Sequence, residues 1–117
     1  MNWSWKIGLP VLVAGMLLAQ TRPRGGSFME AMNSSMKQMD QDMAAAPMSG
    51  NIDHDFAAMM IPHHQGAIDM AKAELTFGRD PVMRRLAQEI IVEQHSEIEA
   101  MNLRLQKMAA SSKAGRP

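Results

Sequence analysis

Five methionines between residues 29 and 43 follow one another at steps of three, four, three and four. This spacing keeps them on one face of an α-helix, as in the seam of a coiled coil, and it does not suit a strand. Glu30 stands three positions after Ser27, which is the pattern of a helix-starting capping box. The sequence therefore predicts a first helix over residues 27–44, with an apolar face made of Met29, Met32, Met36, Met39 and Met43.

A second helix is predicted after a linker at residues 44–51. Asn51 or Asp53 caps its start, and it runs to about Phe77. Pro62 lies inside the segment, where its missing N–H and its ring predict a kink or a break. Gly78 is suited to the position just after the helix, where a residue in the left-handed conformation closes the last turn.

A third helix begins at Asp80-Pro81, an N-cap followed by proline at the first helical position, and runs to about Ala109. The connection at residues 78–80 is so short that the second and third helices must pack antiparallel. That pairing places His63 opposite the level of residues 94–95. No segment alternates as a strand does, so the predicted fold class is all-α.

The N-terminal residues are predicted to lie outside the helical domain. Residues 1–19 combine one lysine, an apolar run and a small residue at the end, which is typical of a secretory signal peptide. The apolar run would span only about 20 Å as a helix, too little for a membrane anchor. We therefore expect a signal peptide at 1–19, a flexible spacer at 20–26, a helical domain at 27–109, a disordered tail at 110–117, and a periplasmic or secreted location.

The composition excludes several classes of protein. The chain has no cysteine, which excludes disulfides, zinc fingers and thiol chemistry. Twelve basic and twelve acidic residues balance, so no basic footprint for nucleic acid exists. A short chain of this kind can hardly bury its Met, Ile and Leu faces alone. We therefore expect a homodimer, in which helices of two copies complete a four-helix bundle.

The residues with metal-binding chemistry gather in the second helix. At 100° per residue, Met59, His63 and Met70 share one face, and Met60 and His64 share the neighbouring face. Thioether and imidazole ligands together suit Cu(I) or Ag(I), whereas hard cations prefer oxygen ligands. Methionine at helical spacing is also ordinary core filler, and a single histidine on an apolar face is usually a packed residue. Both interpretations stay open on spacing alone.

Three polar residues are candidates for a supporting role around such a site. Asp69 and Glu97 could orient the imidazoles, or they could be ordinary solvated charges. Gln94 occupies a position in the apolar stripe of the third helix, and a glutamine in a packed seam needs a partner.

The sequence resembles the domain-of-unknown-function family 305 over about residues 51–108. The resemblance rests on the motifs Asp53-x-x-Phe56, Met60-x-x-His63-His64-x-x-Ala67-x-x-Met70-Ala71 and Gln94-x-x-Glu97-Ile98-x-x-Met101. It implies a ferritin-like helical bundle and metal binding through the two histidines and nearby methionines, Met101 included, as in periplasmic copper-binding proteins of the CopM type. Longer members carry a second His-His repeat, so this chain is a single-repeat short form. The Met-rich first helix lies outside the matched motifs.

These observations lead to one preferred function and two others. We expect an exported protein that sequesters or hands on Cu(I) or Ag(I), supports copper tolerance, has no enzymatic activity and exchanges metal with a copper-handling partner. The alternative is a helical interaction module without metal, whose Met-rich face docks a partner helix. A di-iron oxidase is disfavoured, because no Glu-x-x-His motif occurs.

Overall fold

Each helix begins at a residue whose side chain accepts a hydrogen bond from the first turn. The structure, a computed structural model, describes residues 26–115. Ser27 and Glu30 form the predicted capping box at the start of α1 (Phe28–Ala44). Asn51 accepts from the backbone N–H of His54 at 3.0 Å and caps α2 (Ile52–Phe77). Asp80 caps α3 (Pro81–Ala114). The all-α prediction is confirmed for the described residues.

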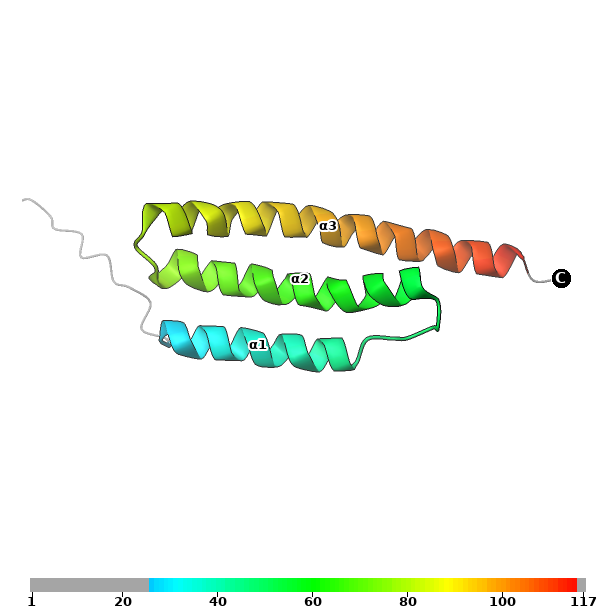
Figure 1. The fold of residues 1–117 in the computed structure, drawn as a ribbon, viewed down its shortest axis with the longest axis horizontal. Coiled ribbons are helices and arrows are strands. Elements are labelled where there is room, and N and C mark those ends of the chain that lie inside the picture. The colour runs from blue at the N-terminus through cyan, green and yellow to red at the C-terminus, as the bar shows by residue number, and fades with distance from the viewer. Residues whose placement is uncertain (1–25, 116–117) are drawn as a thin grey trace, which may run out of the picture.

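The three helices lie side by side in one layer, with α2 in the middle (Figure 1). Helix α2 contacts both neighbours, and among the described residues α1 and α3 do not contact each other. Consecutive helices run antiparallel. The Phe28 and Phe77 rings meet edge to face with their centroids 6.4 Å apart, which joins the start of α1 to the end of α2. A single layer leaves both sides of α2 without a covering helix from its own chain.

Gly66 allows α1 to approach α2 closely. A Cβ atom built on Gly66 would lie 2.7 Å from both Cβ and Sδ of Met39. Ordinary contacts between carbon atoms are about 3.5–4.0 Å, so only glycine fits there at this helix spacing. The glycine in the middle of α2 therefore fixes the distance between the first two helices.

The turn between α2 and α3 differs from the prediction. Gly78 has a φ of −71° and a ψ of 155°, which is extended and not left-handed. Arg84 explains the difference, because its guanidinium donates to the backbone oxygens of Leu75 and Gly78 at 2.6 and 3.1 Å. These hydrogen bonds satisfy carbonyl groups at the end of α2. In many helices such groups are satisfied when a glycine after the last turn adopts the left-handed conformation.

Two further boundaries differ from expectation. Helix α3 ends at Ala114 and not near Ala109, so the expected disorder of the tail is wrong for residues 110–114. That segment contains Ala, Ser and Lys, and no glycine or proline stops the helix before Gly115. Helix α2 continues through Pro62 without a break.

The linker between α1 and α2 is held by one carboxylate. Asp55 accepts hydrogen bonds from the backbone N–H groups of Ser49 and Gly50 at 2.7 and 3.0 Å. It also accepts from the Ser49 hydroxyl and lies 3.0 Å from Nδ1 of His54. The Ser49 backbone bond and then the His54 bond lower the pKa of Asp55 to about 2.

The buried core is small. Its apolar members are mostly alanines, and the only large side chain that is fully buried among the described residues is Ile68. The core consists of Ala57, Ala58, Ile68, Ala71, Ala73 and Ala87. No helix in the described part of the chain is long and apolar enough to cross a membrane. The signal peptide predicted at residues 1–19, and the spacer up to residue 25, lie outside the described residues.

Candidate metal centre

His64 lies in the seam between α2 and α3, near the middle of both helices. Only 10% of its side chain is exposed. Its Nε2 lies 2.6 Å from Oε2 of Glu97 on α3. An ionised carboxylate only accepts hydrogen bonds, so the ring nitrogen is the donor. Glu97 thus holds the imidazole in one orientation, which is one of the two roles that the sequence left open for it.

The second ring nitrogen of His64 has no partner. Among the described residues, Nδ1 of His64 and Oε1 of Gln94 are the buried side-chain polar atoms without a hydrogen bond. When Nε2 carries the proton of a neutral imidazole, Nδ1 presents a lone pair. A buried polar atom without a partner costs about 1–3 kcal/mol. Histidines that bind metals commonly hydrogen-bond a carboxylate through their other ring nitrogen, and His64 makes this hydrogen bond with Glu97.

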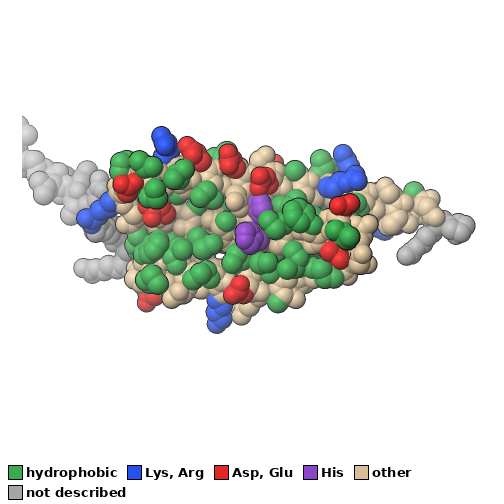
Figure 2. Space-filling view, viewed as in Figure 1, with side chains coloured by type: hydrophobic (Ala, Val, Ile, Leu, Met, Phe, Trp, Pro, Cys, Tyr) green, Lys and Arg blue, Asp and Glu red, His purple; other side chains and the backbone are tan. Residues whose placement is uncertain are grey.

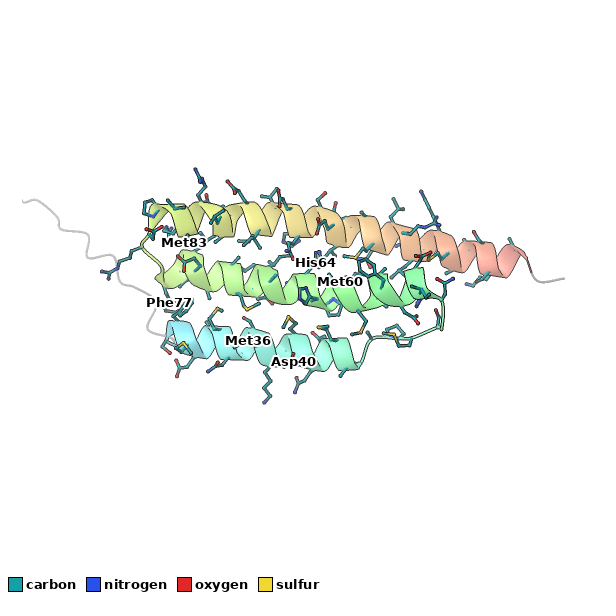
Figure 3. The ribbon with its side chains drawn as sticks, in the orientation of Figure 1. Met36, Asp40, Met60, His64, Phe77 and Met83 are labelled. Carbon is teal, nitrogen blue, oxygen red and sulfur yellow. The ribbon has the colours of Figure 1, made fainter. Side chains whose placement is uncertain are left out.

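Two thioethers share a groove with this histidine. The groove has a volume of about 440 Å³ and runs between α2 and α3. Figure 3 shows Met60 beside His64 in the space between these two helices. The residues that line the groove are Phe56, Met60, His64, Glu97, Ala100 and Met101. The structure therefore brings together three of the six predicted ligands: Met60, His64 and Met101.

The other three predicted ligands lie elsewhere on α2. His63 is exposed, and its ring centroid is 5.9 Å from that of His64. Met70 lines a second groove of about 430 Å³, which α1, α2 and α3 form together. Met59 stands seven residues before Gly66, on the same side of the helix, and therefore faces α1. A site around His64 consequently does not use the whole predicted cluster.

The polar candidates are also separated. Asp69 accepts from Gln65 and lies 3.2 Å from Nζ of Lys72. At 100° per residue, it is about 140° around α2 from His64, so the structure does not place it beside that imidazole. Gln94 was expected opposite His63, but it lines the second groove together with Ala67 and Met70, and its Oε1 has no hydrogen-bond partner among the described residues.

The sequence predicted only some of the residues that line the groove. Phe56 and Ala100 line it, although the sequence interpretation gave them no role at the site. Phe56 precedes Met60 by one helical turn, and Ala100 is next to Met101. These two spacings, of one helical turn and of one residue, could have identified Phe56 and Ala100 as neighbours of the thioethers.

The donors that share the groove with His64 are mainly sulfur atoms. In residues 26–115, no three side chains of the His, Asp and Glu types converge in a way that could hold a metal ion. His64 instead shares its groove with the thioethers of Met60 and Met101. Thioether and imidazole ligands favour Cu(I) and Ag(I) over Mg²⁺ or Ca²⁺.

These features define a helical protein with a sulfur- and imidazole-lined groove at its centre. The chain belongs to the family described as domain of unknown function (DUF305), whose model matches residues 3–105. A stretch of 50 residues is 42% identical to an uncharacterized protein of Acanthamoeba polyphaga mimivirus. This stretch is 43% of the present chain and 33% of the viral protein, so the match covers about a third of that relative.

Proposed function

We propose that this protein binds Cu(I) or Ag(I) at His64, with Met60 and Met101 as thioether ligands, and that it sequesters the metal or hands it on. The observation that carries the proposal is the free Nδ1 of a buried imidazole whose Nε2 is held by Glu97. Glu97 would not touch the metal, and it would keep the ring in the tautomer that presents a lone pair.

The donor set suits a metal carrier more than a catalyst. Imidazole and thioether ligands need no thiolate, so such a site works in a chain without cysteine. The groove opens at the surface of a single chain, where an ion can enter it. Export to the periplasm or beyond, a role in copper tolerance and a copper-handling partner remain part of this proposal. The CopM-like assignment is part of it as well.

A helical interaction module without metal is the second candidate. The open apolar side of α2 favours it, because Phe56 is 62% exposed there and no helix within residues 26–115 covers it. A metal titration separates the two functions, since a docking surface has no reason to prefer Cu(I) to Zn(II).

The test is an anaerobic competition between the protein and a chromophoric Cu(I) chelator. His64→Ala should weaken Cu(I) binding at least about tenfold, because it removes the buried nitrogen ligand. Glu97→Gln should weaken it by about 10–100-fold, the usual effect of removing a residue that orients a ligand. His95→Ala is the matched control, since this histidine is exposed on α3, and it should bind as the parent does.

The methionines distinguish a soft-metal site from a general imidazole site. Met60→Leu and Met101→Leu keep apolar volume and should each cost less than about 1.5 kcal/mol of stability. They should weaken Cu(I) binding and leave Zn(II) binding nearly unchanged, because Zn(II) prefers imidazole and oxygen ligands. Circular dichroism checks the fold of every variant. Unchanged Cu(I) affinity in a folded His64→Ala protein would contradict the proposal.

A further inference from the structure

Helix α2 carries a second apolar stripe that no part of its own described chain covers. The stripe advances at steps of four, three, four and three, as a coiled-coil seam does. Its members are exposed or half-buried. They are Phe56, Met60, His63, Ala67 and Met70.

The opposite side of α2 is polar. Gln65, Asp69 and Lys72 form a hydrogen-bonded group there, with Asp69 accepting from both neighbours. At 100° per residue, this group lies about 170° around the helix from the apolar stripe. The two uncovered sides of α2 therefore differ, with one suited to solvent and one suited to burial.

The neighbouring helices extend the apolar face. A groove of about 430 Å³ beside the stripe is lined by Phe28 and Met32 of α1 and by Leu86 and Ile90 of α3. Figure 2 shows hydrophobic side chains on both sides of centrally placed histidines, with most charged side chains toward the edges. An apolar centre with a charged rim is typical of a buried protein interface. The chain as a whole has no net charge to oppose self-association.

The stripe is complementary to itself when two copies run antiparallel. Its centre is His63, which would stand opposite His63 of the partner subunit. On either side, Met60 would meet the partner subunit's Ala67, so that a large residue faces a small one. Phe56 would meet the partner subunit's Met70. His63 lies at the middle of α2, and Glu97, at the level of His64, lies at the middle of α3. Both long helices would thus overlap along most of their length.

We propose that a second copy of this chain covers the apolar face, with a two-fold axis in the interface that crosses α2 beside His63. The α2 and α3 helices of both copies then form a four-helix bundle. The axis brings the two His63 imidazoles together and creates a site that one chain cannot form. Two facing imidazoles suit the linear or low coordination of Cu(I) and Ag(I), so this site links metal binding to dimerisation. The metal-binding part rests on the proposed function, and the interface does not.

Cysteine cross-linking tests the interface without any metal. The chain has no cysteine, so His63→Cys introduces a single thiol next to the expected axis. Under mild oxidation it should give a disulfide-linked dimer in high yield, because two Cα atoms must come within about 7 Å to be bridged. Gln65→Cys is the matched control on the polar side and should stay mostly monomeric on a denaturing gel. Equal yields from both variants, or no dimer from His63→Cys, would overturn the interface.

A charge at the centre of the face gives an independent test. Ala67→Glu should weaken the dimer at least about tenfold in sedimentation equilibrium, whereas Gln65→Glu should leave it unchanged. Circular dichroism shows whether Ala67→Glu still folds. If it unfolds, the cross-linking yield of His63→Cys alone decides the question.

Silver ion tests the shared site. Ag(I) should shift the parent protein toward the dimer in sedimentation equilibrium, and His63→Ala should lose this shift. His64→Ala should keep it, because that imidazole lies in the groove of its own chain. A shift that survives in His63→Ala would overturn the shared site. Failure of Ag(I) to bind at all, together with efficient His63→Cys cross-linking, would remove the proposed function and leave the interface standing.

Discussion

Truncation of Ile68 tests how much of the stability depends on the seam between α2 and α3. Ile68 is one turn after His64 on the same side of α2 and is 0% exposed. Ile68→Ala removes three carbon atoms, which at about 0.8 kcal/mol each is a loss of roughly 2.4 kcal/mol of transfer free energy. The cavity left behind adds to this loss, and alanine's higher helix propensity returns a few tenths of a kcal/mol. We expect a loss of about 3 kcal/mol from the free energy of unfolding.

Urea unfolding followed by circular dichroism at 222 nm measures this loss. The protein concentration must be the same for all variants, because a dimer's apparent stability depends on it. Val92→Ala is the control, since it also converts a β-branched residue on a helix to alanine but begins 69% exposed. It should change stability by no more than about 0.5 kcal/mol. A loss below about 1 kcal/mol for Ile68→Ala would refute the assignment of this side chain as the centre of the core.

Two further predictions concern α1 and its linker. Gly66→Leu should detach α1 from α2 while α2 and α3 stay paired, so hydrogen exchange should rise in α1 alone, and Gln65→Leu should leave it unchanged. Asp55 has a pKa of about 2, below its unfolded value near 3.9, so its stabilising bonds are complete above pH 4 and are lost as the pH falls toward 2. The protection factors of the Ser49 and Gly50 amides, which correct for the intrinsic pH dependence of exchange, should fall over that range. In Asp55→Asn, which keeps one acceptor oxygen, at least one of the two should already be low at pH 6.

The start of each helix could be predicted from the sequence, because the contacts that cap it lie within its first turn. Ser27 with Glu30, and Asp80 before Pro81, satisfy backbone groups within their own first turn. The end of α2 did not follow from it. Arg84 reaches back from the next helix to bind the final carbonyl groups, and Gly78 therefore has no need of a left-handed conformation. The conformation of Gly78 therefore depends on a residue beyond the turn, and a local sequence pattern cannot predict it.

The level of the candidate site could also be predicted from the sequence. The short turn at residues 78–80 predicted His63 opposite residues 94–95, and the observed contact joins His64 to Glu97, less than one helical turn away. The choice between the two adjacent histidines could not be predicted this way. Neighbours on a helix point about 100° apart, so only the positions of α1 and α3 decide which one is buried. His64 faces α3 and is buried, while His63 faces outward between the two flanking helices.

The sequence by itself determined that the chain forms three helices, where each helix starts, and the kinds of metal-binding atom it carries, because these depend on spacing and residue type. The tertiary structure alone decided which ligands share a groove. Met60 and Met101 are 41 positions apart and line one groove, whereas Met59, adjacent to Met60 in sequence, turns toward α1. The physical reason is that α2 has neighbours on two opposite sides, so its apolar residues are divided among two helix contacts and one open face.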